Sequence, residues 1–301
     1  MTTVNGKTLT LFGCGYVGTA FAREALEKGM TLQALTRNPQ TAEQLRELGV
    51  HKVVVAELHT HDWHSELNPN QDYVLNCVSA ASRDLAGYQK SYIDGQKSIL
   101  KWATLGHLGT FAYTSSTGVY SQNNGEWVDE NDSLKNQDER AALLLEAEHL
   151  ISKNKTDLWD RFFILRLAGI YGPHRHYILD KLLSGEGGFN DNGEHFLNLI
   201  HRDDICNALW AVFTSENTLK NRIYNLCDDH PTPKKKVAQW LAQQFQLPEP
   251  SFCNKGKSET KTIPNRKVSN QRIHKELALE LHCSDFREGY KKTIDNIKSK
   301  Q

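Results

Sequence analysis

The sequence predicts a doubly wound α/β fold, a parallel sheet with helices on both faces, followed by a small C-terminal lobe. Apolar runs alternate with helical patterns through the first two thirds of the chain, which is typical of a parallel sheet. A glycine-rich turn joins the first strand to the first helix. After residue 172 the alternation loosens into Gly/Asn-rich and polar stretches, which indicates a smaller second lobe.

The individual elements follow from this alternation of short apolar runs with amphipathic ones. The expected strands cover residues 8–13, 31–37, 51–58, 72–79, 110–116 and 161–172. The expected helices cover residues 17–29, 41–49, 85–105 and 138–154. Gly29 and Gly49 stand where the first two helices should end, and glycine is the usual residue just beyond a helix.

Composition limits the function. Lys+Arg and Asp+Glu are both 36, so the net charge is zero and we expect neither nucleic acid nor a membrane as partner. The basic run at residues 234–236 opens an amphipathic pattern, and we interpret it as a solvated helical turn. No targeting segment or membrane-length apolar run is visible. Six scattered cysteines suit reduced thiols, so we expect a cytoplasmic protein.

Gly13, Gly15 and Gly18 form the pattern G-x-G-x-x-G between the first strand and helix. The first glycine permits a tight turn, the second lets a pyrophosphate approach the backbone, and the third allows close packing of helix on strand. The helix N-terminus offers N–H groups and partial positive charge to the phosphates. We therefore predict a Rossmann-type dinucleotide site, in which Tyr16 and Val17 also contact the cofactor.

The end of the second strand indicates which cofactor is bound. An NAD site would favour Asp or Glu there, but no acidic residue occurs between Glu27 and Glu43. Arg37 stands there instead and can pair with a 2′-phosphate through its fork of donors. We therefore favour NADP over NAD. NAD stays possible, because Arg37 can also be a solvated residue at a strand end.

Two motifs, YTSSTGVYS at residues 113–121 and LRLAGIYGP at 165–173, complete a recognisable pattern. The chain resembles the extended short-chain dehydrogenase/reductases, the NAD(P)-dependent epimerase/dehydratase family. Residues 91–100, 198–209 and 223–242 extend the resemblance over nearly the whole length. It implies NAD(P) binding and a small-molecule substrate. It also makes a homodimer possible, because related enzymes often pair through the helices after the fourth and fifth strands.

The family's catalytic serine aligns with Ser116. The Tyr and Lys that normally act with it should lie on the following helix, where Arg140 and Leu144 stand at about those positions. No tyrosine occurs between Tyr120 and Tyr171. The chain thus resembles the atypical, YeeZ-like subgroup, which keeps the nucleotide site but lacks the Tyr/Lys pair. Arg140 can hold an anion there or be a surface charge.

Further site residues are predicted beside this pattern. Tyr120 is close in sequence to Ser116, and we name it as the first candidate for a substitute acid/base. For the cofactor we also predict contacts from Ser79, Ala80, Ser115 and Ile170.

The substrate side is expected just after residue 172. Arg175 comes shortly after Gly172-Pro173 and can anchor a phosphate or carboxylate of the substrate. The alternative is that Arg175 is a solvated loop residue. Tyr177 and Lys181 form a Y-x-x-x-K on one helical face, but after the wrong strand for catalysis. We expect packing or substrate contact from Tyr177.

Other conspicuous residues have simpler interpretations. His59, His61 and His64 are expected to be surface histidines, so we predict no metal site. Cys14 is expected to fill a small space in the turn, and Asp204 to cap a helix.

We divide the chain into residues 1–172 with about 196–227 as the NAD(P)-binding domain, and 173–195 with 228–301 as the substrate-side lobe. The leading hypothesis is an NADP-preferring oxidoreductase or epimerase/dehydratase-like enzyme acting on a small substrate similar to a nucleotide sugar. The alternative is a catalytically silent dinucleotide-binding protein that acts as a sensor or interaction module.

Overall fold

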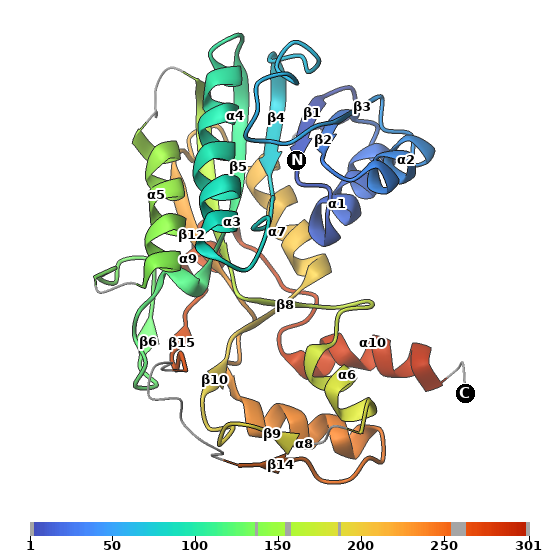
Figure 1. The fold of residues 1–301 in the computed structure, drawn as a ribbon, viewed down its shortest axis with the longest axis vertical. Coiled ribbons are helices and arrows are strands. Elements are labelled where there is room, and N and C mark those ends of the chain that lie inside the picture. Colours follow the sequence, from blue (N-terminus) through green and yellow to red (C-terminus); the bar gives the residue numbers. More distant parts are fainter. Residues whose placement is uncertain (1–2, 136–137, 154–157, 186–187, 254–262, 299–301) are drawn as a thin grey trace. The chain divides into compact units, whose positions relative to one another are not determined.

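The computed structural model describes residues 3–135, 138–153, 158–185, 188–253 and 263–298. Contacts within the chain define two compact units (Figure 1). Unit 1 consists of Met1–Val119, Asn136–Arg166 and Cys206–Tyr224. Unit 2 consists of Tyr120–Lys135, Leu167–Ile205 and Asn225–Gln301. The domain boundaries proposed from the sequence are a different partition and stay a prediction.

A seven-stranded sheet with the strand order β12-β7-β5-β4-β1-β2-β3 confirms the predicted fold class. The neighbouring strands from β5 to β3 all pair in parallel. The order places β1 between β4 and β2, so the chain runs outward from β1 in both directions, as in a doubly wound sheet. The strands are β1 (Thr8–Phe12), β2 (Thr31–Thr36), β3 (Lys52–Val55), β4 (Gln71–Asn76), β5 (Leu108–Ser116), β7 (Trp159–Leu167) and β12 (Arg222–Leu226).

Helices cover both faces of this sheet (Figure 1). They are α1 (Tyr16–Glu27), α2 (Pro39–Glu47), α3 (Leu85–Tyr88), α4 (Gly95–Ala103), α5 (Glu139–Lys153) and α7 (Arg202–Thr214). Trp102 of α4 and Ile151 of α5 belong to one buried cluster with Phe12 and Phe111 of the sheet. Phe21 of α1 packs against aromatic rings of α7.

Unit 2 contains the remaining, shorter elements. Its helices are α6 (Tyr177–Leu183), α8 (Lys234–Gln244), α9 (Gln271–Leu277) and α10 (Phe286–Lys298). Its strands are β6 (Trp127–Val128), β8 (Gly169–Tyr171), β9 (Gly188–Phe189), β10 (Phe196–Leu197), β11 (Leu199–His201), β13 (Thr232–Pro233), β14 (Ser251–Phe252) and β15 (Lys267–Val268). Leu179, Leu241 and Phe286 are among the fully buried side chains of a separate core that joins α6, α8 and α10.

Two predicted elements differ from the observed ones. The helix expected over 85–105 is α3, a π-helical segment η1 (Gln89–Asp94) and α4. In η1, Ile93 enters the core while the Tyr92 hydroxyl accepts a hydrogen bond from Ala80 N at 3.1 Å. The strand expected over 161–172 leaves the sheet after Leu167, because Gly169–Tyr171 pair with β11 instead.

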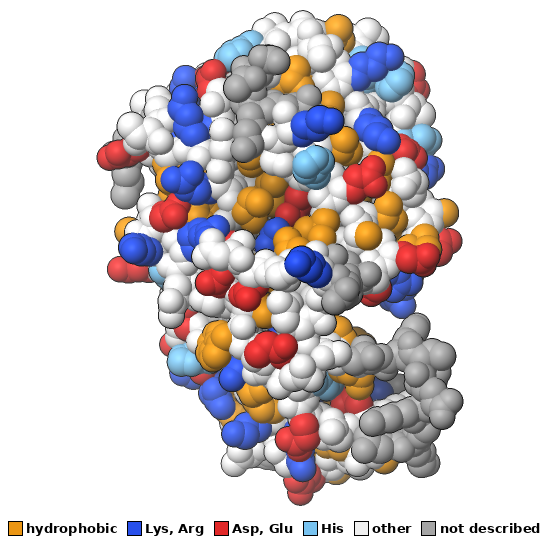
Figure 2. Space-filling view, turned by 90° about the vertical axis from the view of Figure 1, so that its left-hand side faces the viewer, with side chains coloured by type: hydrophobic (Ala, Val, Ile, Leu, Met, Phe, Trp, Pro, Cys, Tyr) orange, Lys and Arg blue, Asp and Glu red, His pale blue; other side chains and the backbone are white. Residues whose placement is uncertain are grey.

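The surface shows no single field of charge. On the face in Figure 2, basic and acidic side chains are interspersed, in keeping with the zero net charge. Within the part of the chain that the structure describes, no helix is both long and apolar enough to span a membrane.

Candidate functional site

The turn between β1 and α1 contains three glycines, each under a different constraint. Gly13 has a φ of +90°, and a Cβ there would lie 2.5 Å from the Val78 amide nitrogen. A Cβ on Gly18 would lie 2.2 Å from the Gly13 carbonyl oxygen. A Cβ on Gly15, by contrast, would meet no atom within 4 Å. Packing thus excludes side chains at the first and third glycines, whereas the second borders open space.

The start of α1 suits an anion. Gly15 is its N-cap, no side chain caps it, and its first turn has no acidic residue. The first N–H groups of a helix lack intrahelical partners and carry partial positive charge. Open space beside Gly15 and an uncapped helix start are what a diphosphate needs, so the residues present fit an NAD(P) cofactor.

Cys14 is a packing residue of this turn. Its side chain is buried and its Sγ lies 3.7 Å from the Leu35 carbonyl oxygen. Burial raises the pKa of the Cys14 thiol to about 12. The thiol is therefore protonated and unreactive at neutral pH, in line with a space-filling role.

Arg37 stands at the end of β2, exposed, as the sequence predicts. Its Nη2 donates to the Ala81 carbonyl oxygen at 3.3 Å, across to the segment that follows β4. The next residue, Asn38, caps α2 by accepting from the amides of Gln40 and Thr41. One long contact leaves most of the Arg37 donors available for a phosphate.

The segment after β4 lies against the glycine turn, since Val78 is the residue that a Cβ on Gly13 would strike. Ser79 and Ala80 follow it directly. The structure thus brings these two predicted cofactor residues to the same edge of the sheet as Gly13.

Ser116 ends β5. Its Oγ accepts a hydrogen bond from Gly118 N at 3.0 Å. A Cβ on Gly118 would lie 3.2 Å from Ser116 Oγ and 3.8 Å from Leu144 Cδ1, so a leucine of α5 faces the small space beside Ser116. Among the described residues, neither a tyrosine hydroxyl nor a lysine ammonium hydrogen-bonds Ser116.

Arg140 lies one helical turn before Leu144 in α5. It is exposed, its Nη2 donates to the Arg83 carbonyl oxygen, and its guanidinium carbon lies 5.6 Å from the centre of the Tyr88 ring. A guanidinium donates hydrogen bonds and accepts none, so Arg140 can hold an anion but cannot accept a proton in place of the tyrosine.

A buried charge pair that the sequence analysis missed connects α5 to the sheet. Glu148 and Arg166 are 4% and 2% exposed, and Arg166 Nη2 lies 2.7 Å from Glu148 Oε2. Ser115 Oγ donates to Glu148 Oε1 at 2.6 Å, so its hydroxyl is engaged inside unit 1. An arginine within the apolar run 162–170 was the one available signal. Its partner, eighteen residues earlier, is identified only by the fold.

Tyr120, the proposed substitute acid/base, lies in unit 2. It is 2% exposed, and its hydroxyl donates to Asn225 Oδ1 at 2.8 Å. Asn225 is held in turn, because its backbone N–H donates to Glu130 Oε1 at 2.7 Å. A buried hydroxyl that donates to an amide oxygen favours a structural role for Tyr120.

The other predicted residues of unit 2 lie in and after β8. Ile170 is in β8, and Arg175 is exposed in a tight loop closed by hydrogen bonds between its backbone and that of Gly172. Tyr177 is 72% exposed, whereas the Lys181 ammonium lies 4.9 Å from the centre of the buried Phe189 ring. In this Y-x-x-x-K the tyrosine is therefore exposed to solvent, whereas the lysine packs on an aromatic ring.

The three clustered histidines point to separate partners. His64 Nε2 lies 3.0 Å from Ser98 Oγ. His61 Nδ1 lies 3.4 Å from the Lys101 ammonium, and His59 Nδ1 lies 3.7 Å from a Glu57 oxygen. His61 is exposed, as predicted, whereas His59 and His64 are half-buried, so the surface interpretation holds for His61 alone.

Asp204 is structural, but not as a cap. It lies inside the first turn of α7, and its two oxygens accept from the amides of His282 and Cys283 at 2.6 and 3.1 Å. Ligand atoms of Asp204, His201 and Cys283 lie within 4.8 Å of one another, which sequence spacing could not reveal. Because both carboxylate oxygens already hold the backbone, the cluster is explained by its role in anchoring the segment before α10.

Comparison with known proteins identifies the family of this chain. The model of the NAD dependent epimerase/dehydratase family matches residues 12–227. The chain is 23% identical to the protein YeeZ of Escherichia coli (strain K12) over 285 residues, 93% of this chain and 97% of that protein.

Solved structures share the fold. A protein from Methylobacillus flagellatus described as an NAD-dependent epimerase/dehydratase is 26% identical, with a TM-score of 0.78 over 97% of this chain and 99% of that one. The UDP-glucuronic acid 4-epimerase of Bacillus cereus, in complex with UDP-glucuronic acid and NAD, is 16% identical. Its TM-score is 0.80 over 98% of this chain and 100% of that one.

Proposed function

The chain belongs to the NAD dependent epimerase/dehydratase family, and on that premise we propose that it binds NADP and acts as an oxidoreductase or epimerase-like enzyme. The observation that carries the proposal is the contrast between Gly15, which borders open space, and Gly13 and Gly18, which packing closes. Only a cofactor that approaches the main chain at the second glycine makes use of that contrast.

The preference for NADP rests on Arg37. In this proposal the exposed guanidinium pairs with the 2′-phosphate, and no carboxylate of β2 competes by holding the ribose hydroxyls. Tyr16, Val17, Ser79, Ala80, Ser115 and Ile170 complete the proposed cofactor contacts.

When bound, the cofactor supplies a hydride acceptor or donor. The substrate is proposed to be small and similar to a nucleotide sugar, supported by the B. cereus relative that was solved with UDP-glucuronic acid. Ser116 is proposed to orient a substrate hydroxyl through its Oγ. Arg175 and Tyr177 are proposed as further substrate contacts. The proton passes to water or to another side chain. Tyr120 is the residue to test first, and its hydrogen bond to Asn225 would have to break for this role.

One observation favours a second function. Leu144 of α5 faces the space beside Ser116, and Arg140, one turn earlier, is exposed and contacts Arg83 and Tyr88. A protein in which cofactor occupancy sets conformation or partner choice needs the glycine turn but no proton transfer. The second candidate is therefore a dinucleotide-binding module without turnover.

Two measurements test these functions. Titration with NADPH and NADH, followed by Trp fluorescence or calorimetry, should show binding under both, with NADPH tighter; absence of binding to either overturns both. Incubation with UDP-glucose and UDP-glucuronic acid plus cofactor, followed by NMR of the sugars and absorbance of NADPH, should show conversion only for the enzyme. A broad panel of carbonyl compounds and nucleotide sugars without conversion favours the module.

Assembly and compartment are also proposed. We expect a homodimer through α4 and α5, which sedimentation should detect as a concentration-dependent doubling of mass. All six cysteines are free, which suits a reducing cytoplasm.

A further inference from the structure

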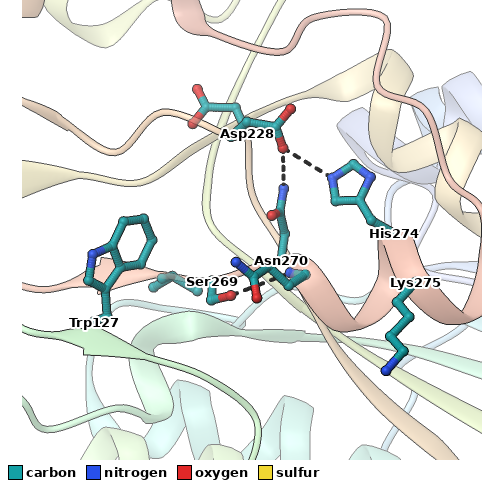
Figure 3. Close-up of a pocket in the computed structure, with 9 residues that line it drawn as sticks. Trp127, Asp228, Ser269, Asn270, His274 and Lys275 are labelled. Atoms are coloured by element: carbon teal, nitrogen blue, oxygen red, sulfur yellow. Dashed lines mark hydrogen bonds and ion pairs between the residues drawn. The ribbon is translucent and has the colours of Figure 1, made fainter.

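Unit 2 contains a cavity of about 590 Å³ that the proposed function does not use (Figure 3). It is bordered by Trp127 of β6, Val268 of β15, α9 and the two aspartates that follow β12, Asp228 and Asp229. Its size lies in the range of small-molecule sites. The groups in its wall therefore indicate what it can hold.

Asp228 is the unusual group in this wall. Its side chain is 2% exposed, and its carboxylate accepts one hydrogen bond, from His230 N at 3.3 Å. Throughout the described chain, no Lys, Arg or His forms an ion pair with it. Burial raises the pKa of Asp228 well above its usual range, and the neighbouring acids Asp285, Asp229 and Asp204 raise it further. An ionised carboxyl at this depth is costly without a cation, so Asp228 keeps its proton until a cation pairs with it.

Its neighbour Asp229, in the same wall, has polar partners for its carboxylate. Asp229 Oδ1 accepts from Asn270 Nδ2 at 2.7 Å and lies 3.0 Å from His274 Nε2. The other ring nitrogen of His274 faces the Leu279 carbonyl oxygen. His274 is thus committed to Asp229, and it is Asp228 that is left without a cation.

Trp127 gives the cavity an aromatic wall. Its side chain is 55% exposed, and the ammonium of Lys267 already lies 5.3 Å from the centre of its ring. The face of an indole attracts cations through its quadrupole, and Trp does so best among the aromatic residues. The remaining cation of the wall, Lys275, extends away from Asp228 in Figure 3.

We propose that this cavity binds a small organic cation, a protonated amine on an apolar or aromatic frame. Its N–H donors meet the Asp228 carboxylate, and its apolar part packs on Trp127 and Val268. A neutral polyol would leave the negative potential of the aspartates unmatched, and an anion would be repelled by it. All the residues that line this cavity belong to unit 2.

The probe is benzylamine, with benzyl alcohol as the neutral compound of the same shape. Calorimetry should show binding of benzylamine and at least about tenfold weaker binding of benzyl alcohol, because a hydrogen-bonded charge is lost. Equal binding of the two compounds, or binding of neither, overturns the proposal. Mg²⁺ that binds Asp228 in competition with benzylamine, and more tightly, would also overturn it by making the site a metal site.

Variants assign the binding to this cavity. Asp228→Asn keeps the shape and should weaken benzylamine binding about tenfold or more, and Trp127→Leu should weaken it less. Asp160→Asn, at an aspartate whose side chain is 62% exposed in unit 1, is the matched control and should bind as wild type. Wild-type affinity in Asp228→Asn places the ligand elsewhere and overturns the proposal. NADPH affinity should be the same in all three variants, so failure here is distinct from failure of the cofactor proposal.

The pH dependence of stability checks that Asp228→Asn folds and that the carboxyl is buried. Because the folded-state pKa of Asp228 is raised, the folded chain holds a proton that the unfolded chain releases above its pKa of 3.8. Wild type therefore loses stability as the pH rises from that value through the folded-state pKa. The variant should lack this loss and unfold at a higher temperature than wild type near neutral pH.

Discussion

Two segments of unit 1 differ in how closely they follow the pattern of the family. The turn between β1 and α1 keeps it, and the first half of α5 departs from it. In the turn, Gly13 and Gly18 are closed by packing and Gly15 is open, which is the geometry that a diphosphate needs. In α5, Arg140 stacks on Tyr88 and Leu144 faces the space beside Ser116.

The difference follows from what each task requires. Binding a diphosphate uses main-chain amides and the absence of side chains, so the intervening residues can vary freely. Proton transfer needs a side chain with a suitable pKa at one position, and a single substitution removes it. A chain can therefore keep the binding half of the site while the catalytic half diverges.

The largest expected effect tests whether α5 has a structural role. Glu148→Ala leaves Arg166 buried without its partner, and should lower the free energy of unfolding by about 3–5 kcal/mol. Urea unfolding measures the change. Glu146→Ala, at an exposed position of the same helix, is the control and should change stability by less than about 0.5 kcal/mol. Equal effects would mean that α5 does not depend on the buried pair.

The next effect tests the turn. Gly15→Val should weaken NADPH binding about 100-fold or more, because the side chain occupies the space of the diphosphate. The melting temperature should fall only slightly, by the cost of a side chain at a ψ of −148°, since φ is −88° and no atom lies within 4 Å of the new Cβ. Gly13→Ala should instead destabilise the fold, because its Cβ would strike Val78. Tight NADPH binding by folded Gly15→Val protein would place the cofactor elsewhere.

A smaller effect sharpens the choice of cofactor. Arg37→Ala should weaken NADPH binding about tenfold and leave NADH binding nearly unchanged, because only the 2′-phosphate contact is lost. Arg46→Ala is a matched control, since Arg46 is exposed and also donates to one backbone carbonyl at 3.3 Å. Parallel losses for both cofactors would make Arg37 a structural residue.

The smallest effect concerns Arg140. Because its guanidinium is exposed, Arg140→Ala should change the free energy of unfolding by less than about 0.5 kcal/mol. NADPH affinity should also be unchanged in the same titration. A clear loss of affinity would show that the divergent half of the site contacts the cofactor, and the contrast between the two segments would disappear.

Much of the first unit was predictable from the sequence. The alternation of strands and helices, the glycine turn and the missing Tyr/Lys pair are local patterns, and the sheet and the family match confirm the fold class and family drawn from them. The split of the helix over 85–105 was not predictable, since a π-helical segment responds to packing at Ile93 and Ala80 rather than to local periodicity.

What the sequence determined by itself is therefore the kind of fold and the turn that suits a cofactor, because both depend on residues near one another in the chain. Tertiary structure alone decided which charges are paired. It joined Glu148 to Arg166, turned the Tyr120 hydroxyl to Asn225, and buried Asp228 without a cation in the wall of a cavity. The free energy of a buried polar or charged group depends on its neighbours in space, and these can be far apart in the chain, as Tyr120 and Asn225 are at 105 residues.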